Sequence, residues 1–108
     1  MTPRPVYGVI RHMTVWLIVR DRRVFEDSYL VEIVIWQVPE SVPPTDHNYK
    51  YRLFYGRKGE RIVGYDNERG KGDHRHLGDM ELPYAFSTIE QLLGDFERDI
   101  VRFRGGPV

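Results

Sequence analysis

The 108-residue chain contains no cysteine, and this absence excludes several classes of protein. Without cysteine there is no disulfide framework, no cysteine-ligated zinc site and no thiol nucleophile, and the composition fits a reducing compartment. The longest apolar run has five residues, Val15 to Val19, which is too short to span a membrane. The first residues lack the regions of a signal peptide. We therefore expect a cytoplasmic protein with no membrane partner.

Common catalytic signatures are missing as well. The chain has no GxxxxGK[ST] or GxGxxG phosphate-binding loop, no HExxH zinc motif and no GxSxG nucleophile motif. Serine occurs only at positions 28, 41 and 87, which argues against a serine nucleophile. If the protein is an enzyme, acid–base chemistry by His, Tyr, Asp and Arg remains. No cofactor is expected.

Alanine occurs once, whereas β-branched and aromatic residues are frequent, which favours a sheet-dominated chain. The formal net charge is zero, and this argues against nonspecific coating of nucleic acid. Thirteen of the sixteen basic residues are arginine, whose planar guanidinium suits the recognition of phosphate. A local basic site is therefore compatible with the neutral total.

Alternation and turn residues predict an antiparallel sheet. The expected strands cover residues 14–20, 29–38, 49–55 and 60–66, with a short extended piece at 74–77. Polar residues 20–23 predict a turn, residues 67–73 predict an exposed loop, and residues 78–86 look irregular. The apolar run at 29–38 predicts a central strand covered on both faces. Short links between strands favour a meander.

A C-terminal helix is the clearest helical signal. Ser87 and Glu90 have the spacing of a capping box, and Gly-Gly-Pro at 105–107 ends the segment. The expected buried side chains follow helical spacing: Ile89, Leu92, Leu93, Phe96, Ile100 and Phe103. The predicted fold is a single α+β domain, with a mostly antiparallel sheet of four to five strands and this amphipathic helix on one face. Residues 1–12 are an N-terminal arm or extra strand, 13–104 the domain, and 105–108 a C-terminal tail.

The segment from Tyr65 to His76 is the strongest candidate site. In an extended segment the imidazoles of His74 and His76 point the same way, so they could share a metal ion or act as acid and base. Asp66 or Asp73 could orient a histidine or complete a metal site. The basic residues placed to contact phosphate are Arg52, Arg61, Arg69, Lys71 and Arg75. The plainer interpretation is a turn at residues 66–67 and a solvated histidine pair.

A row of tyrosines offers a second candidate surface. Tyr49, Tyr51 and Tyr55 share one face of a predicted strand, and Lys50 and Arg52 share the other. Aromatic and basic side chains together bind single-stranded RNA, but here they lie on opposite faces. Packing of the tyrosines under the helix is the favoured interpretation.

These residues resemble a known family. Tyr-Lys-Tyr-Arg-Leu at 49–53, Gly-Tyr-Asp-Asn at 64–67, His-Arg-His at 74–76 and the C-terminal helix are similar to the TumE family, from about residue 13 to 103. The matching positions are Tyr65, Asp66, Asn67, His74 and His76. Many members carry Pro-His-His after Tyr-Asp-Asn, whereas this chain has residues 68–72, Glu-Arg-Gly-Lys-Gly. A role that needs those extra histidines is therefore in doubt.

The resemblance implies a toxin of a type II toxin–antitoxin system that acts on RNA or translation, with a cognate helix-turn-helix antitoxin as partner. The candidate activity is a metal-independent endoribonuclease, in which one histidine takes the 2′-hydroxyl proton and the other protonates the leaving oxygen. RNA or the ribosome is the expected target, and a homodimer stays open. The candidate catalytic residues are His74, His76, Tyr65 and Asp66, and the candidate nucleic-acid-binding residues are Arg52, Lys71, Arg75 and Asn67.

Two other functions stay open. Exposed faces at Tyr49, Tyr51 and Trp36 would favour a noncatalytic module that binds a protein surface. A small metal-binding domain would use His74, His76 and Asp73.

Overall fold

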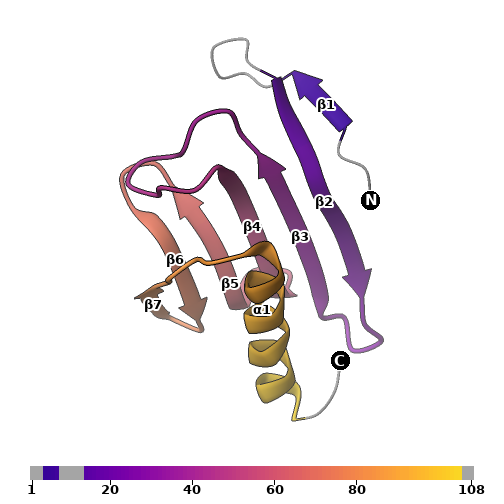
Figure 1. The fold of residues 1–108 in the computed structure, drawn as a ribbon. Coiled ribbons are helices and arrows are strands. Elements are labelled where there is room, and N and C mark those ends of the chain that lie inside the picture. Colours follow the sequence, from indigo (N-terminus) through magenta and orange to yellow (C-terminus); the bar gives the residue numbers. More distant parts are fainter. Residues whose placement is uncertain (1–3, 8–13, 106–108) are drawn as a thin grey trace.

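The computed structural model describes residues 4–7 and 14–105, which form one antiparallel sheet with a helix across one face (Figure 1). The strands lie in the sheet in chain order, so the fold is a meander. The elements are β1 (Arg4–Tyr7), β2 (Thr14–Val24), β3 (Leu30–Gln37), β4 (Tyr49–Arg57), β5 (Glu60–Glu68), β6 (Gly72–Leu77), β7 (Met80–Pro83) and α1 (Ile89–Arg104).

The predicted α+β class, the antiparallel sheet and the C-terminal helix are confirmed, but the described residues form seven strands instead of four or five. The added strands are at the two edges: β1 pairs with β2, and β7 pairs with β6. The proposed start of the domain at Met13, and the tail beyond Gly105, lie outside the described residues. The division of the chain at residues 12 and 104 stays a prediction.

Strands also extend into segments that the sequence assigned to turns and loops. β2 continues through residues 20–23, because each of these residues pairs with β3; the turn follows instead, with Ser28 at a positive φ of 72°. β5 continues to Glu68, so the predicted loop at 67–73 shrinks to the tip at 69–71. In both places the backbone hydrogen bonds to a neighbouring strand stabilise the extended conformation, although the side chains are polar.

The helix covers the tyrosine side of the sheet. Leu92, Phe96 and Ile100 of α1 are buried in the same apolar cluster as Tyr51 and Tyr55 of β4. The favoured interpretation of the tyrosine row is therefore confirmed for these two side chains, which are at most 1% exposed.

The helix ends differ in detail from the prediction. The N-cap is Thr88, whose hydroxyl accepts a hydrogen bond from the Gln91 amide, so the expected cap at Ser87 is wrong by one residue. Gly105 ends the helix in the left-handed region, as the glycine pattern predicted. Phe103, in the last turn, is 48% exposed, so it is not fully buried as predicted, although its ring packs against that of Tyr55 with ring centres 5.7 Å apart.

One face of the sheet is covered by the helix, and the other face is not. The helix face carries Ile35, Tyr51, Leu53, Tyr55 and Tyr65, and the open face carries Val34, Trp36, Lys50, Arg52, Asp66, His74 and His76. Among the described residues α1 is the single helix, and it lies on one face (Figure 1). The expectation that β3 is covered on both faces is therefore wrong. No helix in the described ranges is long and apolar enough to cross a membrane.

Candidate functional site

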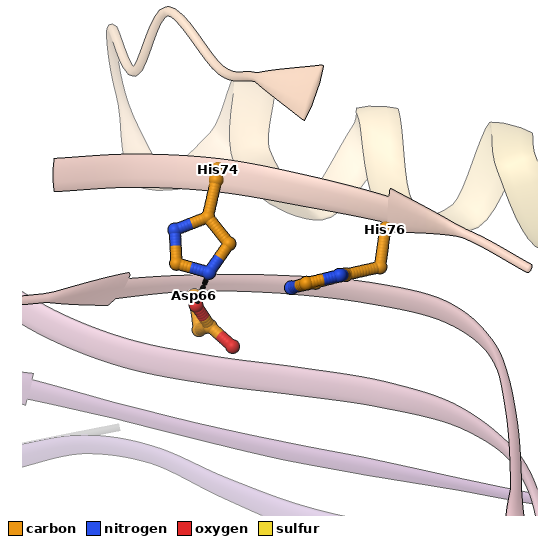
Figure 2. Close-up of side chains that lie close together, drawn as sticks. All are labelled: Asp66, His74 and His76. Carbon is orange, nitrogen blue, oxygen red and sulfur yellow. Dashed lines mark ion pairs between the residues drawn. The ribbon is translucent and has the colours of Figure 1, made fainter. Parts of the chain in front are cut away.

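One row of paired residues crosses four strands of the open face. Val34 of β3 pairs with Arg52 of β4, Arg52 pairs with Asp66 of β5, and Asp66 pairs with His74 of β6. Residues that pair directly in antiparallel strands have side chains on the same face. His76, two residues beyond His74, therefore joins this row. Figure 2 shows both imidazoles extending from β6 toward Asp66.

The contact between Asp66 and His74 is the closest in this group. Asp66 Oδ1 lies 2.5 Å from His74 Nε2, and the other ring nitrogen, Nδ1, lies 3.1 Å from the carbonyl oxygen of Gly72 (Figure 2). Both nitrogens therefore face oxygen acceptors. Asp66 Oδ1 is buried and has no hydrogen bond within the described residues, so the imidazole of His74 is the group that faces this oxygen.

His76 faces a different kind of partner. Arg61 Nη2 lies 2.9 Å from His76 Nδ1. A guanidinium only donates hydrogen bonds, so Nδ1 carries the lone pair and Nε2 the proton. Burial, and then the charge of Arg61, lower the pKa of His76 below its usual 6.5. His76 is therefore neutral at pH 7, and its ring centre lies 4.9 Å from that of His74.

Charged side chains, and not the helix, bury the two imidazoles. The His74 side chain is only 5% exposed, and the carboxylates of Glu68 and Glu81 lie 4.0 and 3.8 Å from its Nε2. Lys71, at the loop tip, lies 3.8 Å from Glu81. These carboxylates and Lys71 are about half exposed, so they can move aside without disturbing the core.

A groove of about 200 Å³ opens beside Asp66 on the same face. Its lining residues are Val34, Trp36, Lys50, Tyr51, Arg52, Asp66 and Glu68. Burial lowers the pKa of Lys50, although Asp66, Glu68 and Asp73 oppose this effect. The Lys50 ammonium donates to the carbonyl oxygen of Asn67. Arg52 is exposed, directly opposite Asp66.

Three of the predicted site residues lie away from this group, on the helix face. Tyr65 is fully buried and donates its hydroxyl proton to Asp99 of α1, and burial followed by this hydrogen bond raises its pKa. Arg75 pairs with the same carboxylate at 3.2 Å. The side chain of Asn67 bridges backbone groups of Tyr49 and Tyr51 at 2.7 and 3.0 Å. Their surroundings are those of residues that stabilise the fold.

Asp73 also lies on the helix face, so the predicted metal ligand set of His74, His76 and Asp73 is not formed. Its carboxylate orients His47 instead, at 2.6 Å from Nε2, and accepts hydrogen bonds from Tyr51 and Thr45. This cluster attaches the segment between β3 and β4 to β6. Asp66, the other carboxylate that the sequence offered, lies beside the histidine pair.

Sequence reasoning did not place three members of the open-face site beside the histidines: Trp36, Lys50 and Glu81. Their positions follow from strand register, because Trp36 pairs with Lys50 and His76 pairs with Glu81. Alternation predicted that Lys50 and Arg52 share a face. Nothing in the sequence gave the pairing of β3 with β4 residue by residue.

Comparison with known proteins gives one match. A family model described as "Toxin TumE" matches residues 14–104, which is most of the chain. No curated protein and no solved structure matches the chain significantly. The matched range contains both faces of the sheet and every residue of the open-face site.

Proposed function

The chain belongs to the TumE toxin family, and we propose that it acts by cleaving RNA at the group formed by Asp66, His74 and His76. The observation that carries this proposal is the difference between the two imidazoles. Nδ1 of His76 faces a guanidinium, which only donates, whereas Nε2 of His74 faces the carboxylate of Asp66. Two neighbouring imidazoles in these surroundings suit the roles of general base and general acid.

The proposed reaction is an internal phosphoryl transfer. His76 takes the proton of a ribose 2′-hydroxyl, and O2′ forms a bond to the adjacent phosphorus. The bond from phosphorus to the 5′ oxygen breaks, and His74 gives its Nε2 proton to that oxygen. The products are a 2′,3′-cyclic phosphate and a 5′-hydroxyl. The protein gains one proton at His76 and loses one at His74, so its total charge is unchanged. The reaction therefore balances without an added metal ion.

Arg61 controls access to the base in this scheme. Its guanidinium occupies the lone pair of His76 at 2.9 Å, and its side chain is exposed. An RNA phosphate attracts this guanidinium, which frees Nδ1 for the 2′-hydroxyl. Arg52 supplies a second charge beside Asp66, and Lys71 a third at the rim. Asp66 positions His74 and does not touch substrate.

The test uses purified protein and a short single-stranded RNA. We expect cleavage that leaves cyclic phosphate and 5′-hydroxyl ends, persists in EDTA and stops when the cleaved ribose lacks its 2′-hydroxyl. His74→Gln and His76→Gln are expected to remove both cleavage and growth arrest. Growth arrest that survives both substitutions would contradict the catalytic role and favour a noncatalytic module.

A metal centre is the second candidate function. Asp66, His74 and His76 offer ligand atoms within 4.8 Å of one another, and the contact from His74 Nδ1 to Gly72 is typical of a metal-bound histidine. Arg61 argues against it, because a guanidinium beside His76 repels a cation. Stoichiometric Zn²⁺ or Mn²⁺ in untagged protein, with activity lost in EDTA, would favour the metal centre.

Membership in a toxin family implies an antitoxin partner. We propose a protein antitoxin with a helix-turn-helix domain, as in a type II system. Co-expression of the neighbouring reading frame should abolish growth arrest and give a stable complex in gel filtration. Rescue by an RNA transcript of that frame, without its protein, would contradict the type II assignment.

A further inference from the structure

The groove beside Asp66 contains a tryptophan that has no aromatic partner. Trp36 is half-buried on the open face, opposite Lys50. Within the described residues its indole makes no ring stacking, cation–π contact or hydrogen bond. By contrast, tyrosines and phenylalanines of the helix face stack on one another, as Tyr29 does on Tyr55 with ring centres 5.5 Å apart. The face of the indole is therefore available to stack on a ring of a ligand.

Arginines without a partner flank this indole. Arg20 of β2 pairs with Val34, and Val34 pairs with Arg52, so both guanidiniums project from the open face. Both side chains are exposed, and neither forms an ion pair or hydrogen bond within the described ranges. Arg57 and Arg104, elsewhere in the chain, pair with carboxylates. Unpaired guanidiniums beside an aromatic ring suit a phosphate backbone with unstacked bases.

The distance from the indole to the catalytic group fits one ligand that reaches both. Trp36 is two strands and two residues away from Asp66, which places their Cα atoms about 12 Å apart at ordinary strand spacing and rise. Lys50 and Arg52 lie between them in the groove. A nucleic acid strand with a phosphate at the histidines therefore has a neighbouring base within reach of Trp36.

We propose that Trp36 is a stacking platform for an unpaired base of single-stranded RNA, with Arg20, Lys50 and Arg52 along the backbone. This inference rests on the proposed function for the choice of RNA, and it adds the substrate form and the binding position. Paired bases cannot stack on the indole, so double-stranded RNA is excluded from this platform.

The experiment uses the two tryptophans of the chain. Trp16→Phe leaves Trp36 as the single tryptophan, and His76→Gln prevents cleavage during the measurement. Titration with a short single-stranded RNA of mixed sequence should quench the remaining tryptophan fluorescence. The same sequence as a duplex should leave it unchanged. Quenching by the duplex to the same extent would overturn the platform.

The affinity measurement uses matched variants in the His76→Gln background. Trp36→Ala should weaken binding of the single-stranded RNA roughly 5- to 150-fold, and Trp36→Phe should restore most of it, because base stacking on an aromatic ring has about this effect. Trp16→Ala is the control, since Trp16 is 40% exposed on β2 and outside the groove. Equal affinities of the Trp36→Ala and Trp16→Ala variants would overturn the proposal.

These outcomes separate the two proposals. If the Trp36→Ala protein cleaves RNA at the unchanged rate, the stacking proposal is contradicted and the proposed catalytic function is retained. If RNA binding depends on Trp36 but the unsubstituted protein does not cleave RNA, the catalytic function is contradicted and the stacking proposal is retained. Quenching by an antitoxin peptide but not by RNA would assign the indole to a protein partner and overturn the inference.

Discussion

The helix face and the open face of one sheet use the same residue types in opposite ways. On the helix face each of three carboxylates accepts a tyrosine hydroxyl: Asp73 from Tyr51, Asp95 from Tyr84 and Asp99 from Tyr65. On the open face Asp66 has an imidazole as its partner, and Arg20 and Arg52 have no partner within the described residues.

This difference separates stability from chemistry. Burial, and then a hydrogen bond to a carboxylate, raise the pKa of Tyr65 and of Tyr84, so these hydroxyls stay protonated. Tyr65 holds α1 to β5, and Tyr84 holds α1 to the segment that follows β7. A buried tyrosine hydroxyl bonded to a buried carboxylate cannot exchange that partner for a substrate without opening the core. On the other face Arg20 and Arg52 are unpaired within the described residues, and the partner of His76 is the exposed Arg61, which can move away. The tyrosine of the Tyr-Asp-Asn segment therefore stabilises the fold, and the aspartate beside it faces the histidines.

Loss of the base should give the largest effect. His76→Gln is expected to lower RNA cleavage by about 10²- to 10⁴-fold, the usual contribution of a general base. The midpoint of thermal unfolding should change little, because glutamine keeps a polar side chain beside the exposed Arg61 and Glu81. Single-turnover cleavage and circular dichroism check the two parts. Full activity would place the chemistry elsewhere.

Loss of a helix-face carboxylate should affect stability instead. Asp99→Ala leaves Arg75 and the Tyr65 hydroxyl without their acceptor in the interior, and should lower the free energy of unfolding by about 3 kcal/mol. Asp79→Ala, in an exposed turn, should change it by less than about 0.5 kcal/mol. Urea denaturation measures both. A stable Asp99→Ala protein that has lost cleavage would reverse the roles of the two faces.

The contact between Arg61 and His76 predicts a pH dependence. Because the pKa of His76 is lowered from its usual 6.5, more than half of the imidazole is neutral at pH 6.5, and the midpoint of the acidic limb of kcat/KM should lie below this pH. Burial, Arg61 and His74 all lower this pKa, and Arg61→Ala removes one of these causes, so the acidic limb should move to higher pH. NMR titration of the histidine rings and the pH profile should agree. An unshifted profile would show that Arg61 does not act on the base.

Phosphate contacts on the open face should give the smallest effect. Arg52→Ala is expected to weaken RNA binding severalfold and to reduce the slope of log K against log salt by about 0.7, the value for one phosphate of a single strand. Arg57→Ala, on the same strand but paired with Glu60, is the control and should leave the slope unchanged. Identical slopes for the two variants would show that Arg52 does not contact the backbone.

The sequence predicted the fold class and part of the site from short-range patterns. Alternation along β4 separated Tyr51 from Arg52, and helical spacing identified Leu92 and Phe96 as core residues. Strand ends were less well predicted, as at residues 20–23 and at Asn67. Polar residues in a sheet are acceptable wherever a neighbouring strand satisfies the backbone, and that neighbour is not visible in a local window.

The amino-acid sequence by itself determined the antiparallel α+β architecture, the position of the helix and the pairing of His74 with His76 on one face, since these depend on periods of two and 3.6 residues. Only the tertiary structure decided that Asp66 and not Asp73 joins the histidines, that Tyr65 faces Asp99, and that Trp36 shares a groove with Arg52. These facts depend on the register between strands and on which face the helix covers. Both are set by packing between residues far apart in the chain.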